Sequence, residues 1–289
     1  MRGRIVKALS GFYYTKSEDG LIYSCRARGK FRKDDLHPLV GDVCDFDITD
    51  EKDLEGSITS ICPRTSELSR PPVANLDQAV VVFAVKSPDP SIYLLSKYLV
   101  MLEKRGIDAI VVFQKSDLDE DDACRDLAAV FESAGYRVCV ISALVGSGLD
   151  ELRDLLRGHV STVAGPSGAG KSTLINALCG RDIAATGSVS EKTGRGKQTT
   201  RHTELIEIEK DTFLFDTPGF SAVDIGDVKP EELGGLFPEF SDVGDCYFRG
   251  CSHRSEPGCA VKDALDRGVI HPARYEAYTM IYDELLKKH

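Results

Sequence analysis

Several features that mark membrane, secreted and repetitive proteins are missing from this chain of 289 residues. No apolar run approaches the ~20 residues that a membrane-spanning helix needs. The start of the chain, Met1 to Arg4, leads into no hydrophobic segment of the kind found in signal peptides. There is no internal repeat and no long low-complexity tract. We therefore expect a cytoplasmic protein without a membrane partner, with two or three domains.

An excess of positive charge is also absent, since the formal net charge is −10. This average argues against a nucleic-acid partner, but the basic residues are unevenly spread. A local basic face can still attract a polyanion, because the local potential steers the encounter. The candidate RNA-binding residues fall within eight positions: Arg26, Arg28, Lys30, Arg32 and Lys33.

The nine cysteines divide into two groups. Six are scattered and lie mostly in apolar runs, which predicts ordinary buried, reduced thiols: Cys25, Cys44, Cys62, Cys124, Cys139 and Cys179. The other three form C-x4-C-x-H-x5-C with a histidine: Cys246, Cys251, His253 and Cys259. Three thiolates and one imidazole suit a closed tetrahedral Zn²⁺ site, which is structural because no position stays open for catalysis. The alternative is a set of free thiols in a loop.

The composition and the pattern of apolar residues change twice along the chain. Residues 1–70 contain short alternating segments between Gly and Asp turns, which is typical of a small all-β module. Residues 71–225 alternate expected strands (80–85, 109–113, 137–141, 160–164, 212–215) with expected helices (92–104, 124–133, 149–156). Residues 226–289 are rich in Gly, Pro and acidic residues, then in Cys, and end in an expected helix over 272–288. We predict a multi-domain α/β protein whose central sheet is mostly parallel, with helices on both faces.

A phosphate-binding loop is predicted between an apolar strand and a helix. Gly165-Pro166-Ser167-Gly168-Ala169-Gly170-Lys171-Ser172 fits G-x-x-x-x-G-K-[ST], and the helix continues from Thr173. In such loops backbone amides surround the phosphates, the lysine reaches the β and γ phosphates, and the hydroxyl after it holds Mg²⁺. The alternative, a Gly-rich turn without function, does not account for the flanking strand and helix.

Two further segments predict the switch elements of a nucleotide hydrolase. Asp216-Thr217-Pro218-Gly219 follows an apolar strand as D-x-x-G, where the Asp holds a Mg²⁺-bound water and Gly219 contacts the γ-phosphate. Residues 193–200 have no helical or strand periodicity, and either Thr199 or Thr200 could ligate Mg²⁺; we favour Thr200.

Hydrolysis is expected to be slow without help. Phe220 follows Gly219 where Ras-like enzymes have the glutamine that orients the attacking water. A phenyl ring cannot do this, so another group or a partner must position the water. Gln198 is one candidate in the chain, beside Lys171 as a catalytic group.

The base-reading motif comes before the phosphate loop. Gln114-Lys115-Ser116-Asp117 ends an expected strand and approximates N-K-x-D. There a carboxylate accepts two hydrogen bonds from guanine, whereas adenine would leave it unpaired. Ser142-Ala143 ends the next strand and matches the S-A motif, whose backbone amide contacts guanine O6. Either segment alone is often a helix cap. Together they predict GTP and GDP as ligands.

Ordinary GTPases have these motifs in the order phosphate loop, switch, D-x-x-G, N-K-x-D and S-A. Here the two base motifs come first, which indicates a circular permutation. With the C-x4-C-x-H-x5-C cluster, the chain closely resembles, over its whole length, the RsgA family (also called YjeQ or YloQ). It departs from that family at Gln114, usually Asn or Thr, and at Gln198, usually His.

The resemblance implies an OB-fold over residues 1–70, a permuted GTPase domain over 71–225 and a zinc-binding domain over 226–289. It also places Tyr23 and Phe31 with the basic residues on an RNA-facing strand. The implied activity is GTP hydrolysis, stimulated by the small ribosomal subunit during its late maturation and coupled to release. The expected partners are that subunit and its 16S-type rRNA, and we expect a monomer. Two alternatives stay open: an RNA-binding scaffold with a non-hydrolysing nucleotide site, and a nucleotide-driven metallochaperone.

Overall fold

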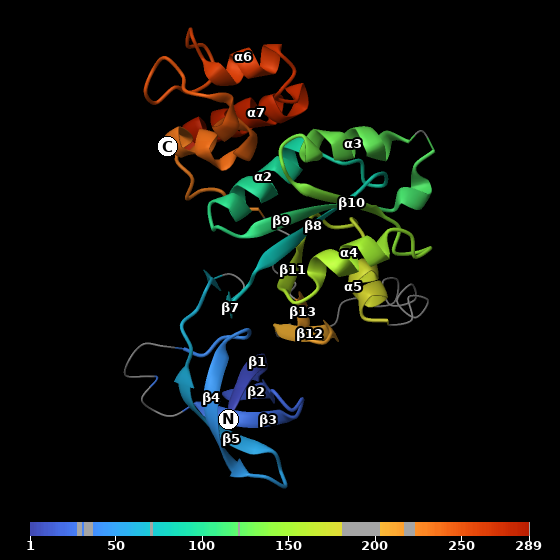
Figure 1. Ribbon diagram of the computed structural model, residues 1–289, viewed down its shortest axis with the longest axis vertical. Helices are drawn as coiled ribbons and strands as arrows, with labels where there is room; N and C mark the ends of the chain where they lie inside the picture. The colour runs from blue at the N-terminus through green and yellow to red at the C-terminus, as the bar shows by residue number, and fades with distance from the viewer. Residues whose placement is uncertain are drawn as a thin grey trace. The chain divides into compact units, whose positions relative to one another are not determined.

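The structure is a computed structural model that describes residues 1–27, 31, 37–69, 72–120, 122–180, 203–216 and 223–288 (Figure 1). It contains two compact units. The first comprises residues 1–78, 154–163 and 178–220, and the second comprises residues 79–153, 164–177 and 221–289.

The first unit begins with a five-stranded barrel. Its strands are β1 (Arg2–Leu9), β2 (Phe12–Ser17), β3 (Ile22–Ala27), β4 (Val43–Asp50) and β5 (Glu55–Ile61). They pair in the order β1-β2-β3-β5-β4, and β4 returns to β1, so the barrel is closed. Inward-facing side chains such as Ile5, Phe46 and Ile58 alternate with outward-facing ones and form its core. The predicted all-β module is confirmed as a small OB-type barrel.

The same unit contains strands from the central part of the sequence. β11 (Val160–Ala164) runs parallel to β13 (Thr212–Asp216), and β13 is antiparallel to β12 (Glu204–Glu209). β12 in turn pairs with the barrel strand β1 at Lys7 and Glu204. Two short strands, β6 (Glu67–Ser69) and β7 (Pro72–Ala74), form a separate ladder.

The second unit holds the strands that precede the phosphate loop. β8 (Gln78–Ala84), β9 (Asp108–Gln114) and β10 (Arg137–Ile141) lie side by side in the order β10-β9-β8. β8 is buried along its whole length, as expected for a strand that is covered on both faces. The helices are α2 (Ile92–Glu103), α3 (Ala123–Glu132), α4 (Leu149–Leu156) and α5 (Lys171–Leu178), with the short 3₁₀ helix η1 (Ser116–Leu118). The predicted alternation of strands and helices is confirmed.

The C-terminal segment belongs to this second unit. It contains η3 (Pro230–Leu236), η4 (Pro238–Val243), α6 (Ala260–Asp266) and α7 (Pro272–Lys288), and α7 packs along α2 (Figure 1). Lys97 of α2 forms an ion pair with Glu284 of α7 at 2.8 Å. The rings of Phe237, Phe240 and Tyr278 fill the space between η3, η4 and α7.

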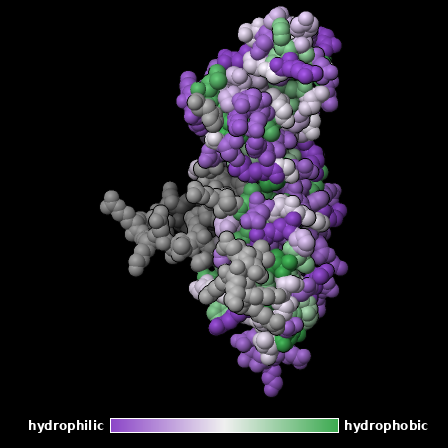
Figure 2. Space-filling view, turned by 90° about the vertical axis from the view of Figure 1, so that its left-hand side faces the viewer, coloured by the Kyte–Doolittle hydropathy of each residue, from purple (hydrophilic) through white to green (hydrophobic). Residues whose placement is uncertain are grey.

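The surface in Figure 2 is predominantly hydrophilic, and hydrophobic residues form only small areas on the face shown. Among the residues that the structure describes, no helix has the length and apolar character that a membrane span requires.

Candidate functional site

The phosphate loop connects β11 to α5, and its conformation depends on glycine. Gly165, Gly168 and Gly170 have φ angles of 136°, 80° and 92°, in the region that other residues rarely adopt. A Cβ atom at position 165 would lie only 2.1 Å from the carbonyl oxygen of Val82 on β8. Only a glycine therefore allows the loop to approach β8 this closely.

Lys171 and Ser172 stand at the start of α5, where the first amides of a helix have no partner within the helix. The Nζ atom of Lys171 donates to the carbonyl oxygens of Gly165 and Pro166, at 2.8 and 2.6 Å. Burial lowers the pKa of Lys171. Ser172 is exposed, so its hydroxyl is accessible to a ligand. The lysine lies across the loop, in reach of a phosphate group that the helix amides would bind.

The base-reading motif lies at the end of β9, in the same unit. Lys115 has a left-handed backbone conformation with a φ angle of 68°, and Asp117 is exposed within η1. The hydroxyl of Ser142, at the end of β10, donates a hydrogen bond to Asp117. This contact orients the carboxylate while leaving acceptor positions free for a ligand.

Gln114 connects the base motifs to the phosphate loop. Its Oε1 atom accepts hydrogen bonds from the backbone amides of Lys115 at 2.6 Å and Ala143 at 3.1 Å. A Cβ atom built at Gly170 of the phosphate loop would lie 3.1 Å from its Cγ and Nε2 atoms. The structure thus brings the three predicted segments together around a glutamine that is 2% exposed.

One segment next to this site was not predicted. The ammonium group of Lys115 donates to the carbonyl oxygen of Ser87, and Pro88 lies 3.4 Å from the position of a Cβ atom on Gly168. The loop that follows β8 therefore contacts both the base motif and the phosphate loop. The turn Ser87-Pro88-Asp89-Pro90 after an apolar strand is the signal that could have revealed it.

Several predicted residues lie outside the described part of the chain. They are Arg28, Lys30, Arg32, Lys33, Gln198, Thr199, Thr200, Gly219 and Phe220. The backbone of Asp216 ends β13, in the first unit. Arg26 is the penultimate residue of strand β3, and its guanidinium group lies 4.4 Å from the centroid of the Phe12 ring.

Two expectations about side-chain environment need correction. Tyr23 and Phe31, expected on an RNA-facing strand, are only 4% and 5% exposed and belong to the barrel core. Tyr23 packs against Phe46, because alternate residues of β3 point inward and place Tyr23 on the opposite face from Arg26. Among the six scattered cysteines, Cys25, Cys44 and Cys139 are buried, whereas Cys62, Cys124 and Cys179 are only partly buried.

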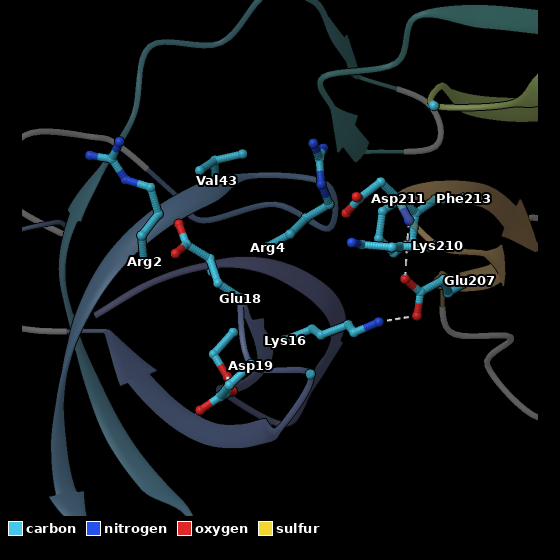
Figure 3. Close-up of a pocket in the computed structure, with 14 residues that line it drawn as sticks. Arg2, Arg4, Lys16, Glu18, Asp19, Val43, Glu207, Lys210, Asp211 and Phe213 are labelled. Atoms are coloured by element: carbon cyan, nitrogen blue, oxygen red, sulfur yellow. Dashed lines mark hydrogen bonds and ion pairs between the residues drawn. The ribbon is translucent and has the colours of Figure 1, made fainter.

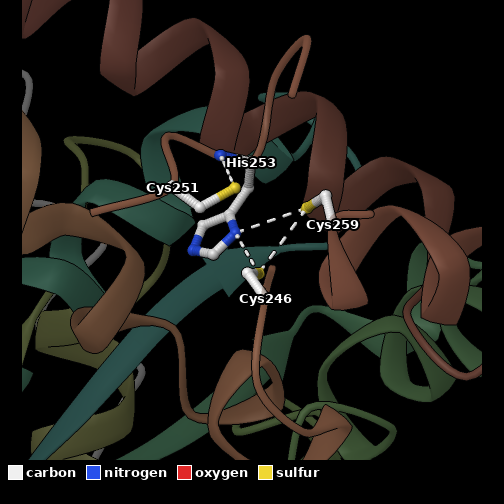
Figure 4. Close-up of side chains that lie close together, drawn as sticks. All are labelled: Cys246, Cys251, His253 and Cys259. Carbon is white, nitrogen blue, oxygen red and sulfur yellow. Dashed lines mark hydrogen bonds between the residues drawn. The ribbon is translucent and has the colours of Figure 1, made fainter. Parts of the chain in front are cut away.

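The four predicted metal ligands converge in the C-terminal segment (Figure 4). One ligand atom from each of Cys246, Cys251, His253 and Cys259 lies within 4.8 Å of the others. The Nδ1 atom of His253 lies 3.5 Å from the sulfur atoms of both Cys246 and Cys259. Burial lowers the pKa of His253 and so favours the neutral imidazole that a metal requires. The set of donors is compatible with zinc.

The chain around these ligands is held by hydrogen bonds to its backbone. The hydroxyl groups of Tyr275 and Tyr278 on α7 donate to the carbonyl oxygens of His253 and Ser252, at 2.7 and 2.8 Å. The carboxylate of Glu256 accepts from the amides of Ser252, Arg254 and Ser255. Such outer contacts fix the orientation of ligands before a metal binds.

A pocket of about 470 Å³ in the first unit contains no predicted site residue (Figure 3). It lies where β1 and β2 meet the β12–β13 hairpin. Lys16 forms an ion pair with Glu207 across it, and the guanidinium group of Arg4 lies 5.5 Å from the centroid of the Phe213 ring. The other charged residues of its wall are Arg2, Glu18, Asp19, Lys210 and Asp211. Its acidic and basic groups are balanced, so the pocket favours neither an anion nor a cation.

Comparison with known proteins finds relatives of one family along the whole chain. Residues 61–226 match the family described as RsgA GTPase, and residues 2–58 match the RsgA N-terminal domain. The small ribosomal subunit biogenesis GTPase RsgA of Clostridium kluyveri is 45% identical over 289 residues, covering 100% of this chain and 99% of that protein. The protein of that name from Agathobacter rectalis is 43% identical, covering 99% and 98%.

Two solved structures are similar throughout their length. YjeQ from Thermotoga maritima has a TM-score of 0.84 and 37% identity, covering 99% of this chain and 98% of that one. YloQ, described as a circularly permuted GTPase, has a TM-score of 0.82 and 37% identity, covering 100% and 96%. The motif order, the loop geometry and these similarities agree: the chain belongs to the RsgA family of circularly permuted GTPases.

Proposed function

We propose that this GTPase binds the small ribosomal subunit, assists its late maturation, and couples GTP hydrolysis to its own release. The observation that carries the proposal is the similarity, over essentially the full chain, to relatives named for small ribosomal subunit biogenesis. The relatives' name supplies the biological process, and the intact Lys171 and Ser172 support nucleotide turnover.

In this proposal the nucleotide lies across the segments that Gln114 connects. Residues 165–173 bind the phosphates, while Asp117 and Ala143 read the guanine base, with Lys115 and Ser116 beside them. Ser172, Asp216 and one of Thr199 and Thr200 would hold Mg²⁺, which neutralises charge on the phosphates when bound. Gly219 would contact the γ-phosphate, and Cys246, Cys251, His253 and Cys259 would hold one structural Zn²⁺.

Fast hydrolysis requires a group that positions the attacking water, and contact with the subunit would bring such a group into place. Phe220 cannot orient water, and Gln198 is the group in the chain that we propose for this task, assisted by Lys171. The contact with 16S-type rRNA would include Arg26, Arg28, Lys30, Arg32 and Lys33. We further propose a cytoplasmic monomer with domains at residues 1–70, 71–225 and 226–289.

The decisive experiment compares hydrolysis of GTP and ATP by the full chain, with and without purified small subunits. We expect slow GTP hydrolysis that rises at least tenfold with subunits, little ATP hydrolysis, and neither in a Lys171→Ala control. Binding to subunits without any stimulation would instead support the RNA-binding scaffold. A metallochaperone would lose its zinc to a mild chelator during turnover, whereas our proposal expects the metal to stay bound.

A further inference from the structure

The backbone amide assigned to guanine O6 is already hydrogen-bonded within the protein. The N–H group of Ala143 donates to Oε1 of Gln114 at 3.1 Å. The preceding amide, that of Ser142, donates to the carbonyl oxygen of Ser147 at 3.0 Å. The base site thus contains an internal acceptor, Oε1 of Gln114, for the amide that guanine O6 would contact.

The glutamine is held in this position from several sides. Its backbone carbonyl oxygen accepts from the amide of Val85 at 2.9 Å, which fixes the end of β9. Its Oε1 atom also accepts from the amide of Lys115 at 2.6 Å. Gly170 leaves the room that the side chain needs, because a Cβ atom there would approach its Cγ and Nε2 atoms to 3.1 Å.

We propose that Gln114 is a specificity-determining gate at the base site, whose side-chain oxygen occupies the Ala143 amide until guanine O6 displaces it. The inference rests on the proposed GTP-binding role of the same site. Displacement breaks one hydrogen bond, while the shorter bond from the amide of Lys115 is kept. The base then exchanges one buried hydrogen bond for another, so O6 adds little net affinity.

This gate shifts the discrimination between bases to Asp117. Asp117 is exposed, and within the described part of the chain the hydroxyl of Ser142 is the one side-chain group that donates to it. The carboxylate therefore keeps acceptor capacity for guanine. The wild-type protein should therefore discriminate strongly against bases that lack the two donors of the guanine edge. It should discriminate weakly between bases that differ only in the atom at position 6.

The test uses Gln114→Met, which keeps the length and volume of the side chain and replaces the amide by a weak acceptor. GDP and 6-thio-GDP differ at position 6 only, and sulfur accepts hydrogen bonds poorly. We expect the wild type to bind the two within roughly threefold of each other, because O6 gains little net free energy. In Gln114→Met the Ala143 amide is free, so GDP should bind roughly 3- to 10-fold more tightly, and the preference over 6-thio-GDP should rise equally. Leu144→Ala, which alters an exposed neighbour, serves as the control.

A second measurement observes the amide directly. In the nucleotide-free wild type, the Ala143 amide should be protected from hydrogen exchange. The Gln114→Met variant should lose this protection, and GDP binding to the variant should restore it. Equal weakening of GDP and 6-thio-GDP in Gln114→Met, or unchanged affinity, would overturn the gate and leave Gln114 as a structural residue. A wild type that binds no GDP would overturn the proposed function as well, which separates the two failures.

Discussion

Arg274 and Glu239 form an ion pair that is almost completely withdrawn from solvent. Their closest atoms are 2.6 Å apart, and their side chains are 1% and 4% exposed. Arg274 also donates to the hydroxyl of Ser96 on α2 at 2.7 Å, and its guanidinium group lies 4.5 Å from the centroid of the Phe237 ring. One side chain of α7 thus joins η4 and the GTPase helix α2.

Removing one partner of this pair should strongly destabilise the folded protein. We expect Arg274→Ala to lower the free energy of unfolding by about 3–5 kcal/mol, because the carboxylate of Glu239 would stay buried without a partner. Urea denaturation measures the change. The double variant Arg274→Met, Glu239→Leu removes both charges and should recover much of the loss. Equal losses in the single and double variants would contradict this account.

The glycine at the start of the phosphate loop can be tested against a glycine in open space. We expect Gly165→Ala to weaken GTP binding more than about tenfold, since its Cβ atom would clash with the backbone of Val82. The matched control is Gly135→Ala in the same unit, whose φ angle of 88° is also positive but whose Cβ atom would meet nothing within 4 Å. Isothermal titration of both variants with GTP makes the comparison. Similar binding by the two would refute the role of close approach.

Asp117→Asn should change which base is bound. Its amide offers one donor and one acceptor, which match the edge of xanthine but not the two donors of guanine. We expect GTP affinity to fall about 100-fold or more and XTP affinity to rise. Competition between the two labelled nucleotides measures the switch. A parallel loss of both would indicate that Asp117 acts on folding of the loop and not on the base.

Removing the metal should affect the Cys/His segment selectively. A strong chelator, or Cys251→Ser, should accelerate hydrogen exchange over residues 246–266, because this segment depends on the ligands for its order. Helix α7 should remain protected, since it packs on α2 through contacts such as Lys97 with Glu284. Uniform exchange of the whole C-terminal segment would show that the metal supports α7 as well. Release of about one zinc per chain is the accompanying readout.

The contact between α2 and α7 should be sensitive to acid. Burial would raise the pKa of Glu284, but hydrogen bonds from Lys97, Tyr93 and Lys288 outweigh it and lower that pKa to about 2. A carboxylate with a lowered pKa stabilises the fold above its unfolded pKa, and this contribution disappears as the pH falls toward 2. We expect wild-type stability to fall between about pH 5 and pH 2, and Glu284→Gln to fall less steeply. Parallel curves for the two proteins would exclude Glu284 as a source of the slope.

Much of the fold and part of the site followed from local spacing alone. The strands and helices of the central region, the phosphate loop and the four metal ligands depend on residues close together in sequence, so their patterns are visible there. The placement of Tyr23 and Phe31 on an RNA-facing strand, which the resemblance implied, was wrong, because both side chains lie in the barrel core. In β3 the strand alternation, which places Tyr23 in the core and Arg26 outside it, was the better guide.

The permuted order of motifs, the family and the identity of the residues available for chemistry are all readable from the amino-acid sequence. Which partner each of these residues has depends on how the chain packs in three dimensions. The hydrogen bond between Gln114 and Ala143 spans 29 positions, and that between Arg274 and Ser96 spans 178. Such contacts form when distant segments pack, and their energy depends on burial and on exact atomic distances. Neither quantity is encoded in local spacing.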